Sequence, residues 1–431
     1  MWGEARQLPP TPRTSMKKKA ILFFAASPLL YAGTPEITPA PAPASAYWIT
    51  PTIDVRARYE FADIDGFDQS NAFTTRERVG LKTADWNGFS GVVEGEFTQA
   101  IVDDYSAGPA AAGVKPFVQN NSTIFDPENN ELNQLFVQYK GFDSVFKLGR
   151  QKIIYDNAAF IGNVGWRQNE QTYDAFSVVN NSIDGLTLSG AYINQVNRIF
   201  GAEALGQFRN APADIFLLNA SYKGISGLTL GAYGYFMNFD NTNDNGAADK
   251  WDNNTVGVSA TGDLVGLTLY GELAYQDQAG NLDDREALYT HLTATKKFGK
   301  QSVTLGLEHL DAGFQTPLAT VHVFNGFADV TDTARLDGNH NGLTDLYVTY
   351  ALPIFYGIKW SNTVHAMGDN AISTSYGYEF DSVLTKKFDE HFTAIAKLAH
   401  FESEGGDYIA DKSSAGLPTT DRFSVELNYT F

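Results

Sequence analysis

Apolar and polar residues alternate along the last segment of the chain. Its apolar positions are Phe423, Val425, Leu427, Tyr429 and Phe431, and the positions between them are polar. Because successive side chains of a β-strand point to opposite faces, this pattern predicts a strand with one apolar and one polar face.

The segment from Asp54 to Glu60 alternates in the same way, but its polar face is charged. That face holds Asp54, Arg56, Arg58 and Glu60, and the residues between them are Val55, Ala57 and Tyr59. Segments of this kind, rich in β-branched and aromatic residues, recur from Tyr47 onward. We predict eighteen strands, which start near Ile49, Thr74, Phe89, Leu132, Val145, Tyr173, Leu186, Ile215, Leu228, Asn254, Leu267, Leu288, Ser302, Asp345, Phe355, Ser375, Phe392 and Arg422.

The connections between these segments are short and long in turn. Short turns include Asp85–Gly88 and Gly141–Ser144. The long loops are polar: Ile101–Asn130, Ile154–Gln171, Asn197–Asp214, Asp240–Asn253, Asp311–Gly342 and Ser403–Asp421. Short periplasmic turns and long external loops are typical of a transmembrane up-and-down β-barrel. The pattern therefore predicts an all-β, antiparallel barrel of about 18 strands over residues 47–431.

The N-terminal residues have the layout of a secretory signal. Met16 and the lysines Lys17–Lys19 precede an apolar run from Ala20 to Tyr31, and small residues follow. A basic start, a short apolar run and small residues are the three parts of a cleaved signal peptide. We therefore expect residues 1–46 to be an upstream extension, a signal peptide beginning at Met16 and a proline-rich linker, and the protein to be exported to the bacterial outer membrane.

The amino-acid composition excludes several classes of protein. The chain has no cysteine, which excludes disulfide scaffolds and thiolate metal sites. Its formal net charge of −19 argues against nucleic-acid binding through a basic surface. No run of apolar residues is long enough for a membrane-spanning helix, so any membrane span must use strands. No serine stands near a histidine in a recognisable catalytic motif, and we expect no enzyme activity.

Charged residues on the inner faces of strands are the candidates for lining a pore, because the same groups facing lipid would cost roughly 2–4 kcal/mol near the midplane. The candidates are Arg56, Arg58, Arg76, Arg78, Lys82, Glu94, Glu96, Lys359 and Arg422. The arginines can form a ladder for carboxylate or phosphate groups of a passing solute. In the alternative, arginine and glutamate neighbours pair across strands and fill a polar interior.

Two short motifs introduce a family resemblance. The runs Gly149-Arg150-Gln151 and Trp166-Arg167-Gln168, followed by Asp174, make the chain resemble the alginate-export outer-membrane porins. The resemblance implies a monomeric barrel of eighteen strands, in which Arg150, Arg167 and Asp174 lie in or near a constricted, basic path for an anionic polysaccharide. The negative net charge of this chain departs from what a path for a polyanion requires.

Three functions remain open from the sequence. The first is a channel for anionic or hydrophilic solutes, including uronate-containing oligosaccharide or polysaccharide. The second is a porin specific for small carboxylates, and the third is a surface protein whose long acidic loops bind a partner. In each case we expect a monomer surrounded by outer-membrane lipid and lipopolysaccharide, with no nucleic-acid partner.

One loop carries a candidate metal site. The candidate ligands of a calcium ion are Asp337, Asn339, Asn341 and Asp345. Short oxygen-bearing side chains alternate there around a glycine turn, as in the first half of a calcium-binding loop. The bidentate glutamate of such a loop is missing, since Val348 occupies its place. A turn rich in Asn, Asp and Gly is the alternative, and we expect no other cofactor.

Overall fold

The computed structural model describes residues 48–240, 251–278, 286–332, 336, 341–405 and 416–431. The expected signal peptide and linker, the candidate ligands Asp337 and Asn339, and parts of several long loops lie outside the described residues. Within the described range, no helix is long and apolar enough to cross a membrane.

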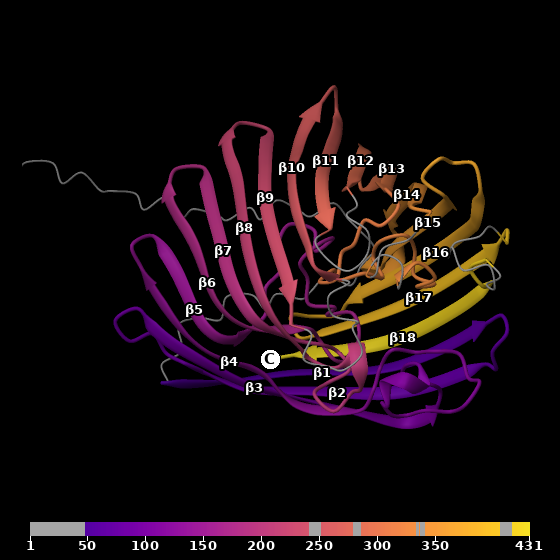
Figure 1. Cartoon of the computed structure of the whole chain (residues 1–431), viewed down its shortest axis with the longest axis horizontal. Coiled ribbons are helices and arrows are strands. Elements are labelled where there is room, and N and C mark those ends of the chain that lie inside the picture. The colour runs from indigo at the N-terminus through magenta and orange to yellow at the C-terminus, as the bar shows by residue number, and fades with distance from the viewer. Residues whose placement is uncertain (1–47, 241–250, 279–285, 333–335, 337–340, 406–415) are drawn as a thin grey trace, which may run out of the picture. The chain divides into compact units, whose positions relative to one another are not determined.

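The described residues form one antiparallel sheet of 18 strands, in which each strand pairs with its neighbours in sequence (Figure 1). The strands are β1 (Ile49–Ile64), β2 (Ser70–Thr83), β3 (Phe89–Asp104), β4 (Asn129–Gly141), β5 (Ser144–Gln151), β6 (Thr172–Ile183), β7 (Leu186–Asn197), β8 (Ala211–Ile225), β9 (Leu228–Phe239), β10 (Asn253–Leu264), β11 (Leu267–Gln278), β12 (Glu286–Phe298), β13 (Gln301–Leu310), β14 (Leu343–Pro353), β15 (Lys359–Gly368), β16 (Ser375–Lys387), β17 (Phe392–Ser403) and β18 (Thr420–Thr430). The predicted strand number is confirmed, and each predicted start lies within four residues of the observed one.

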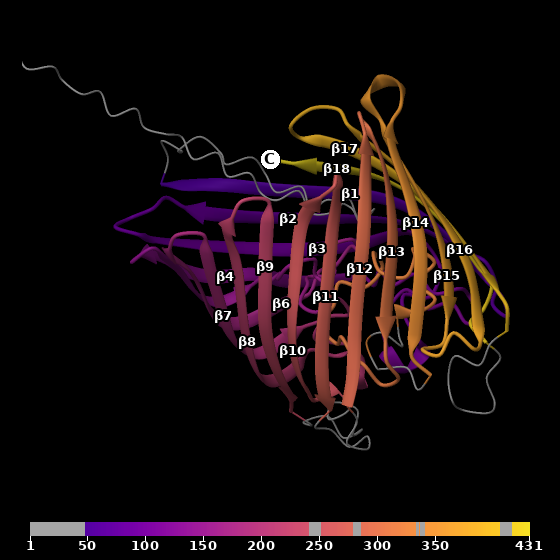
Figure 2. The same ribbon diagram turned by 90° about the horizontal axis from the view of Figure 1, so that it is seen from above.

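The first and last strands close the sheet into a barrel. β1 pairs with β18 from Asp54 opposite Thr430 to Ile64 opposite Thr420. In Figure 2, β10, β11 and β12 stand side by side on another part of the wall, as their pairing requires. Closure leaves no sheet edge with unpaired backbone groups, which is the condition for a sheet to cross a lipid bilayer.

The alternation of residues decides which side chains face inward. On β18, Val425 and Leu427 expose 43% and 46% of their surface, whereas Glu426 between them exposes 2%. β1 repeats the pattern, with Arg56 and Arg58 buried. Large apolar residues are exposed in the same way on every part of the barrel wall. They form the surface that faces lipid and leave the polar residues inside.

The connections follow the predicted rhythm of tight turns and long loops. Residues 84–88 and 142–143 form tight turns, whereas residues 105–128 form a long connection. The predicted strand start at Phe355 comes four residues early, because Phe355–Gly357 is a 3₁₀ turn and β15 begins at Lys359. Tyr356 in that turn has a φ of 56°, which a strand does not allow.

We expect a charged residue at the centre of the outer face of β10 to destabilise the folded barrel. Val258 is 56% exposed at the middle of β10, whereas Val265 is 89% exposed in the tight turn that follows. Val258→Arg should lower the free energy of unfolding in lipid vesicles by about 2–4 kcal/mol, because its guanidinium would face hydrocarbon. The control Val265→Arg should lower it by less than about 1 kcal/mol. Equal losses in urea unfolding would contradict the assignment of this face to lipid.

Candidate functional site

Six of the candidate charges are buried on the inner face of the barrel. They are Arg56, Arg58, Arg76, Arg78, Glu96 and Arg422. Glu94 is half-buried and accepts hydrogen bonds from Asn133 Nδ2 and Gln134 Nε2, both at 2.9 Å. Lys82 and Lys359 are exposed at the ends of β2 and β15 that meet tight turns, so these two lysines stand apart from the buried group.

Arg58 and Glu426 join the first strand to the last. Arg58 donates to Glu426 Oε2 from Nη2 at 2.7 Å and from Nε at 3.0 Å. Its Nη1 donates to Asp126 Oδ2 at 3.2 Å, and its Nη2 also donates to the backbone carbonyl of Trp166. All four residues are buried, so water screens these ion pairs little. At this position the arginine and the glutamate pair across strands.

The connection between β5 and β6, residues 152–171, folds into the barrel interior, and we call it the first inward loop. Arg56 donates from Nη1 to the carbonyls of Trp166 and Arg167, at 3.0 and 2.9 Å. Its Nη2 donates to the carbonyl of Gly165 at 3.1 Å. An arginine of β1 therefore fixes this loop through backbone groups.

The connection between β13 and β14 also turns inward, and its residues 311–332 form the second inward loop. The Ala328 N–H donates to Glu379 Oε1 on β16 at 2.7 Å. Arg422 Nε on β18 donates to the Ala328 carbonyl at 2.8 Å. A carboxylate and a guanidinium from different strands thus hold the same residue of the loop.

The two inward loops meet in the barrel interior at what we call the loop seam. The Gly162 N–H of the first loop donates to the Leu318 carbonyl of the second at 2.8 Å. The ring of Trp166 stacks on His322, with centroids 3.4 Å apart and an interplanar angle of 9°. Because each loop is also tied to the wall, together they narrow the lumen.

Arg167 is the charged residue that anchors the loop seam. It donates to both oxygens of Glu60 at 3.0 Å and to Asp329 Oδ2 at 2.9 Å. Burial alone would lower the pKa of Arg167, but Glu60, Asp126 and Asp329 outweigh burial and raise the pKa. The guanidinium therefore stays charged and pairs with carboxylates from β1 and from the second inward loop.

His322 lies between two charges at the loop seam. Its Nδ1 is 2.6 Å from Asp329 Oδ1, and its Nε2 is 2.8 Å from Lys397 Nζ on β17. A neutral ring satisfies both neighbours, because Nδ1–H donates to the carboxylate and Nε2 accepts from the ammonium. Burial and the Lys397 ammonium lower the pKa of His322 to about 3, which agrees with a neutral ring.

Arg76 has two side-chain nitrogen atoms without a hydrogen-bond partner among the described residues, whereas Arg78 and Arg167 each have one. Arg76 exposes 1% of its surface, and its Nη2 donates to Asp54. Its Nε and Nη1 atoms have no hydrogen-bond partner among the described residues. The buried ion pairs of the barrel interior form what we call the charge network. Asp54 keeps 33% of its side chain exposed, so the charge network reaches solvent at this residue. Arg76 thus has donors left for a group that the described part of the chain does not supply.

Arg150 and Asp174 lie on the outer face of the barrel. Arg150 donates to the two carboxylate oxygens of Asp174 from Nε and Nη2, at 2.7 and 3.0 Å. In the β4–β5 pairing Arg150 is opposite Leu135, which is 51% exposed on the lipid-facing side. Directly opposed residues of an antiparallel pair share a face. The expectation that this pair lies in or near a basic path is therefore corrected, and of the three motif residues Arg167 alone is inside.

The described residues do not form the candidate calcium site. Asp345 is buried on β14, where His365 Nδ1 lies at 2.9 Å and Asn325 Nδ2 donates at 3.2 Å. Asn341 is in the connection that precedes β14. In the described range, no group of three or more His, Asp or Glu side chains is placed to hold a metal ion.

Sequence reasoning missed the loop residues that complete the charge network. Asp126, Glu170 and Asp329 are buried, and they lie within 4 Å of the strand arginines Arg58, Arg78 and Arg422 respectively. They occur in irregular segments without periodicity, so no pattern marks them as inward-facing. Lys397 was missed as well, although its place in the alternation of β17 indicates an inner position.

Comparison with known proteins identifies the fold. No protein-family model matches the chain, and no curated protein matches its sequence. Among solved structures, Pseudomonas aeruginosa OpdO has a TM-score of 0.64 at 12% identity, covering 89% of this chain and 97% of that one. Acinetobacter baumannii OccAB4 has a TM-score of 0.63 at 14% identity, covering 90% and 99%. The outer membrane protein OpdK of P. aeruginosa has a TM-score of 0.62 at 11% identity, covering 89% and 99%.

These similarities support the barrel architecture and leave the cargo undetermined, because the identities are low. They do not support the specific alginate-export family that the two motifs suggested. The position of Arg150 on the outer face agrees with that outcome.

We expect His322 to remain neutral well below pH 7. Its ring signals in an NMR titration should shift with a midpoint of about 3, and Lys397→Met should raise the midpoint by removing the neighbouring positive charge. The unfolded ring protonates near 6.5, so this group's contribution to stability is complete above that pH and is lost as pH falls towards about 3. A midpoint at or above 6.5 would contradict the buried, neutral ring.

Proposed function

We propose that the protein is an outer-membrane channel for small hydrophilic solutes that carry a carboxylate or a similar anionic group. The observation that carries this proposal is Arg76, a buried guanidinium on the inner face of a closed barrel. Two of its nitrogen atoms have no hydrogen-bond partner among the described residues. The proposed role is passage of a solute, without catalysis.

The energetics at Arg76 favour an anionic group. A buried donor without a partner costs about 1–3 kcal/mol, and more when it is charged. A carboxylate that accepts from Nε or from Nη1, whose N–H groups point to different sides of the guanidinium, recovers part of that cost through a charge-assisted hydrogen bond. Arg56 is opposite Arg76 in the β1–β2 pairing and adds a second positive charge on the same face.

The inward loops favour a small solute over a polymer. The loop seam and the contacts of each loop with the wall hold both loops inside the barrel. A uronate-containing polysaccharide would have to displace both loops, whereas a small carboxylate has to pass beside them. The inward burial of these loops also weighs against a surface-binding role that depends on them.

The location we propose is the bacterial outer membrane, with the barrel inserted as a monomer among lipid and lipopolysaccharide. The apolar outer face of the barrel supports insertion in a bilayer. Similarity to an outer membrane protein supports the choice of membrane. Export by a signal peptide within residues 1–46 is part of the same proposal.

Arg76→Gln should weaken the binding of anions in the channel and lower its anion selectivity. Block of the chloride current by propionate in planar bilayers should require a roughly tenfold higher concentration, the equivalent of one lost charge-assisted hydrogen bond. Anion preference in the reversal potential should also fall, because a buried positive charge is removed. The control Lys300→Gln also removes one positive charge, but from an exposed turn, and should alter neither quantity. A cation-selective wild type that does not respond to Arg76→Gln would overturn the proposal.

Breaking the loop seam should raise the conductance. Trp166→Ala removes the ring that stacks on His322, so the two inward loops lose a large packed contact and the lumen widens. The control Trp360→Ala removes a tryptophan that is 38% exposed on β15 and should leave single-channel conductance unchanged. If Trp166→Ala conducts like the wild type, the loop seam does not set the width of the path.

A further inference from the structure

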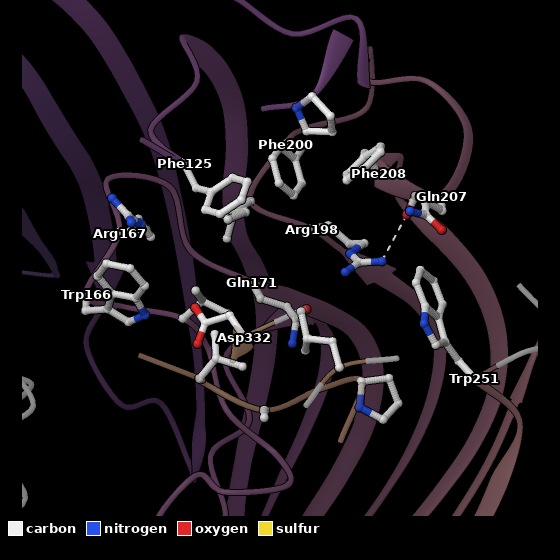
Figure 3. A pocket seen from close by; sticks show the side chains of 17 residues that line it. Phe125, Trp166, Arg167, Gln171, Arg198, Phe200, Gln207, Phe208, Trp251 and Asp332 are labelled. Atoms are coloured by element: carbon white, nitrogen blue, oxygen red, sulfur yellow. Dashed lines mark hydrogen bonds between the residues drawn. The ribbon is translucent and has the colours of Figure 1, made fainter. Parts of the chain in front are cut away.

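A cavity of about 230 Å³ lies among the connections at the loop end of the barrel (Figure 3). Five aromatic residues line it: Phe125, Trp166, Phe200, Phe208 and Trp251. Phe200 meets Phe125 and Phe208 edge to face, with ring centroids 5.9 and 5.2 Å apart. The five residues come from four different connections, so long-range folding brings the rings together.

The arginines at this cavity are engaged by the chain itself. Arg167 is paired with carboxylates at the loop seam. Arg198 Nη1 donates to the Gln207 carbonyl at 2.9 Å, and its guanidinium lies over the ring of Trp251 at 4.5 Å from the centroid (Figure 3). Neither arginine presents an isolated positive charge to the cavity.

Among the described lining residues, Asp332 supplies the only carboxyl group, and this group is also engaged. Asp332 is 7% exposed, and its Oδ1 accepts a hydrogen bond from the backbone N–H of His322 at 3.3 Å. Burial and the neighbouring Asp329 raise the pKa of Asp332 well above its ordinary value, which favours the uncharged form. The described lining is therefore mainly aromatic, and each of its charged groups is held by contacts within the chain.

We propose that this cavity binds one uncharged monocyclic aromatic compound, such as a benzyl alcohol. A cavity of about 150 Å³ with apolar walls holds benzene, so about 230 Å³ accommodates one ring with a short polar substituent. The aromatic walls attract a ring through dispersion and edge-to-face contacts. A charged solute would lose its hydration there without an unpaired counter-charge to replace it. Arg76 is not among the described residues that line this cavity, and the proposal goes beyond the proposed channel function.

The test uses the full chain in lipid nanodiscs, because detergent would itself enter an apolar cavity. Binding of 4-fluorobenzyl alcohol is followed by the broadening of its fluorine NMR signal as protein is added. Phe200→Ala removes part of the lining, and Gln207→Trp fills the cavity while it keeps the backbone oxygen that Arg198 uses. The control Phe142→Ala removes a phenylalanine that is 82% exposed in a tight turn.

Saturable binding is expected for the wild type and for Phe142→Ala. The affinity should be roughly tenfold lower in Phe200→Ala, which loses one aromatic contact, and in Gln207→Trp, whose added ring occupies the space. No saturable binding, equal binding in all four proteins, or preference for 4-fluorobenzoate over the alcohol would overturn the proposal. Heat-modifiable gel mobility verifies that each barrel is folded. Gln207→Trp changes one loop side chain and decides the question if Phe200→Ala does not fold. Arg76→Gln should bind the alcohol normally, which separates this site from the anion path.

Discussion

The interior of the barrel depends on the pairing of Arg58 with Glu426 across the two strands that close it. A strand that faces lipid on one side must turn every second residue inward, and β1 and β18 bring their charges together from opposite ends of the chain. Removing one partner of such a buried pair typically costs about 3–5 kcal/mol. Arg58 also donates to the Trp166 carbonyl. The same side chain therefore links the two closing strands, neutralises Glu426 and positions the first inward loop.

The charge network then determines which arginine is available to a solute. Arg56 is used by loop carbonyls and Arg167 by carboxylates, so neither has its full set of donors left for a passing anion. Arg76 lies where the inward loops offer no such partner, beside the partly exposed Asp54. A ladder of arginines in the sequence is therefore mostly structural, and the proposed binding capacity is concentrated where the structural partners end.

The wall of the barrel was predictable because the period-two pattern is local and each strand repeats it. For Arg150 the family resemblance implied a position in or near the lumen path, whereas the β4–β5 pairing places it on the outer face with Leu135. The inward loops were not predictable, because their direction depends on contacts between distant residues, such as Arg56 with Trp166. The aromatic cavity escaped prediction for the same reason, since four connections supply its rings.

The most direct measurement of the proposed role of Arg76 is the location of a bound carboxylate in the barrel. Crystals of the barrel soaked in 3-bromopropionate and measured at the bromine absorption edge would show the solute by its anomalous signal. A bromine peak is expected beside Arg76, with the carboxylate on Nε or Nη1, and this peak should be lost in Arg76→Gln. A peak elsewhere in the lumen with none at Arg76, or a peak that persists unchanged in the variant, would contradict the proposed role of Arg76.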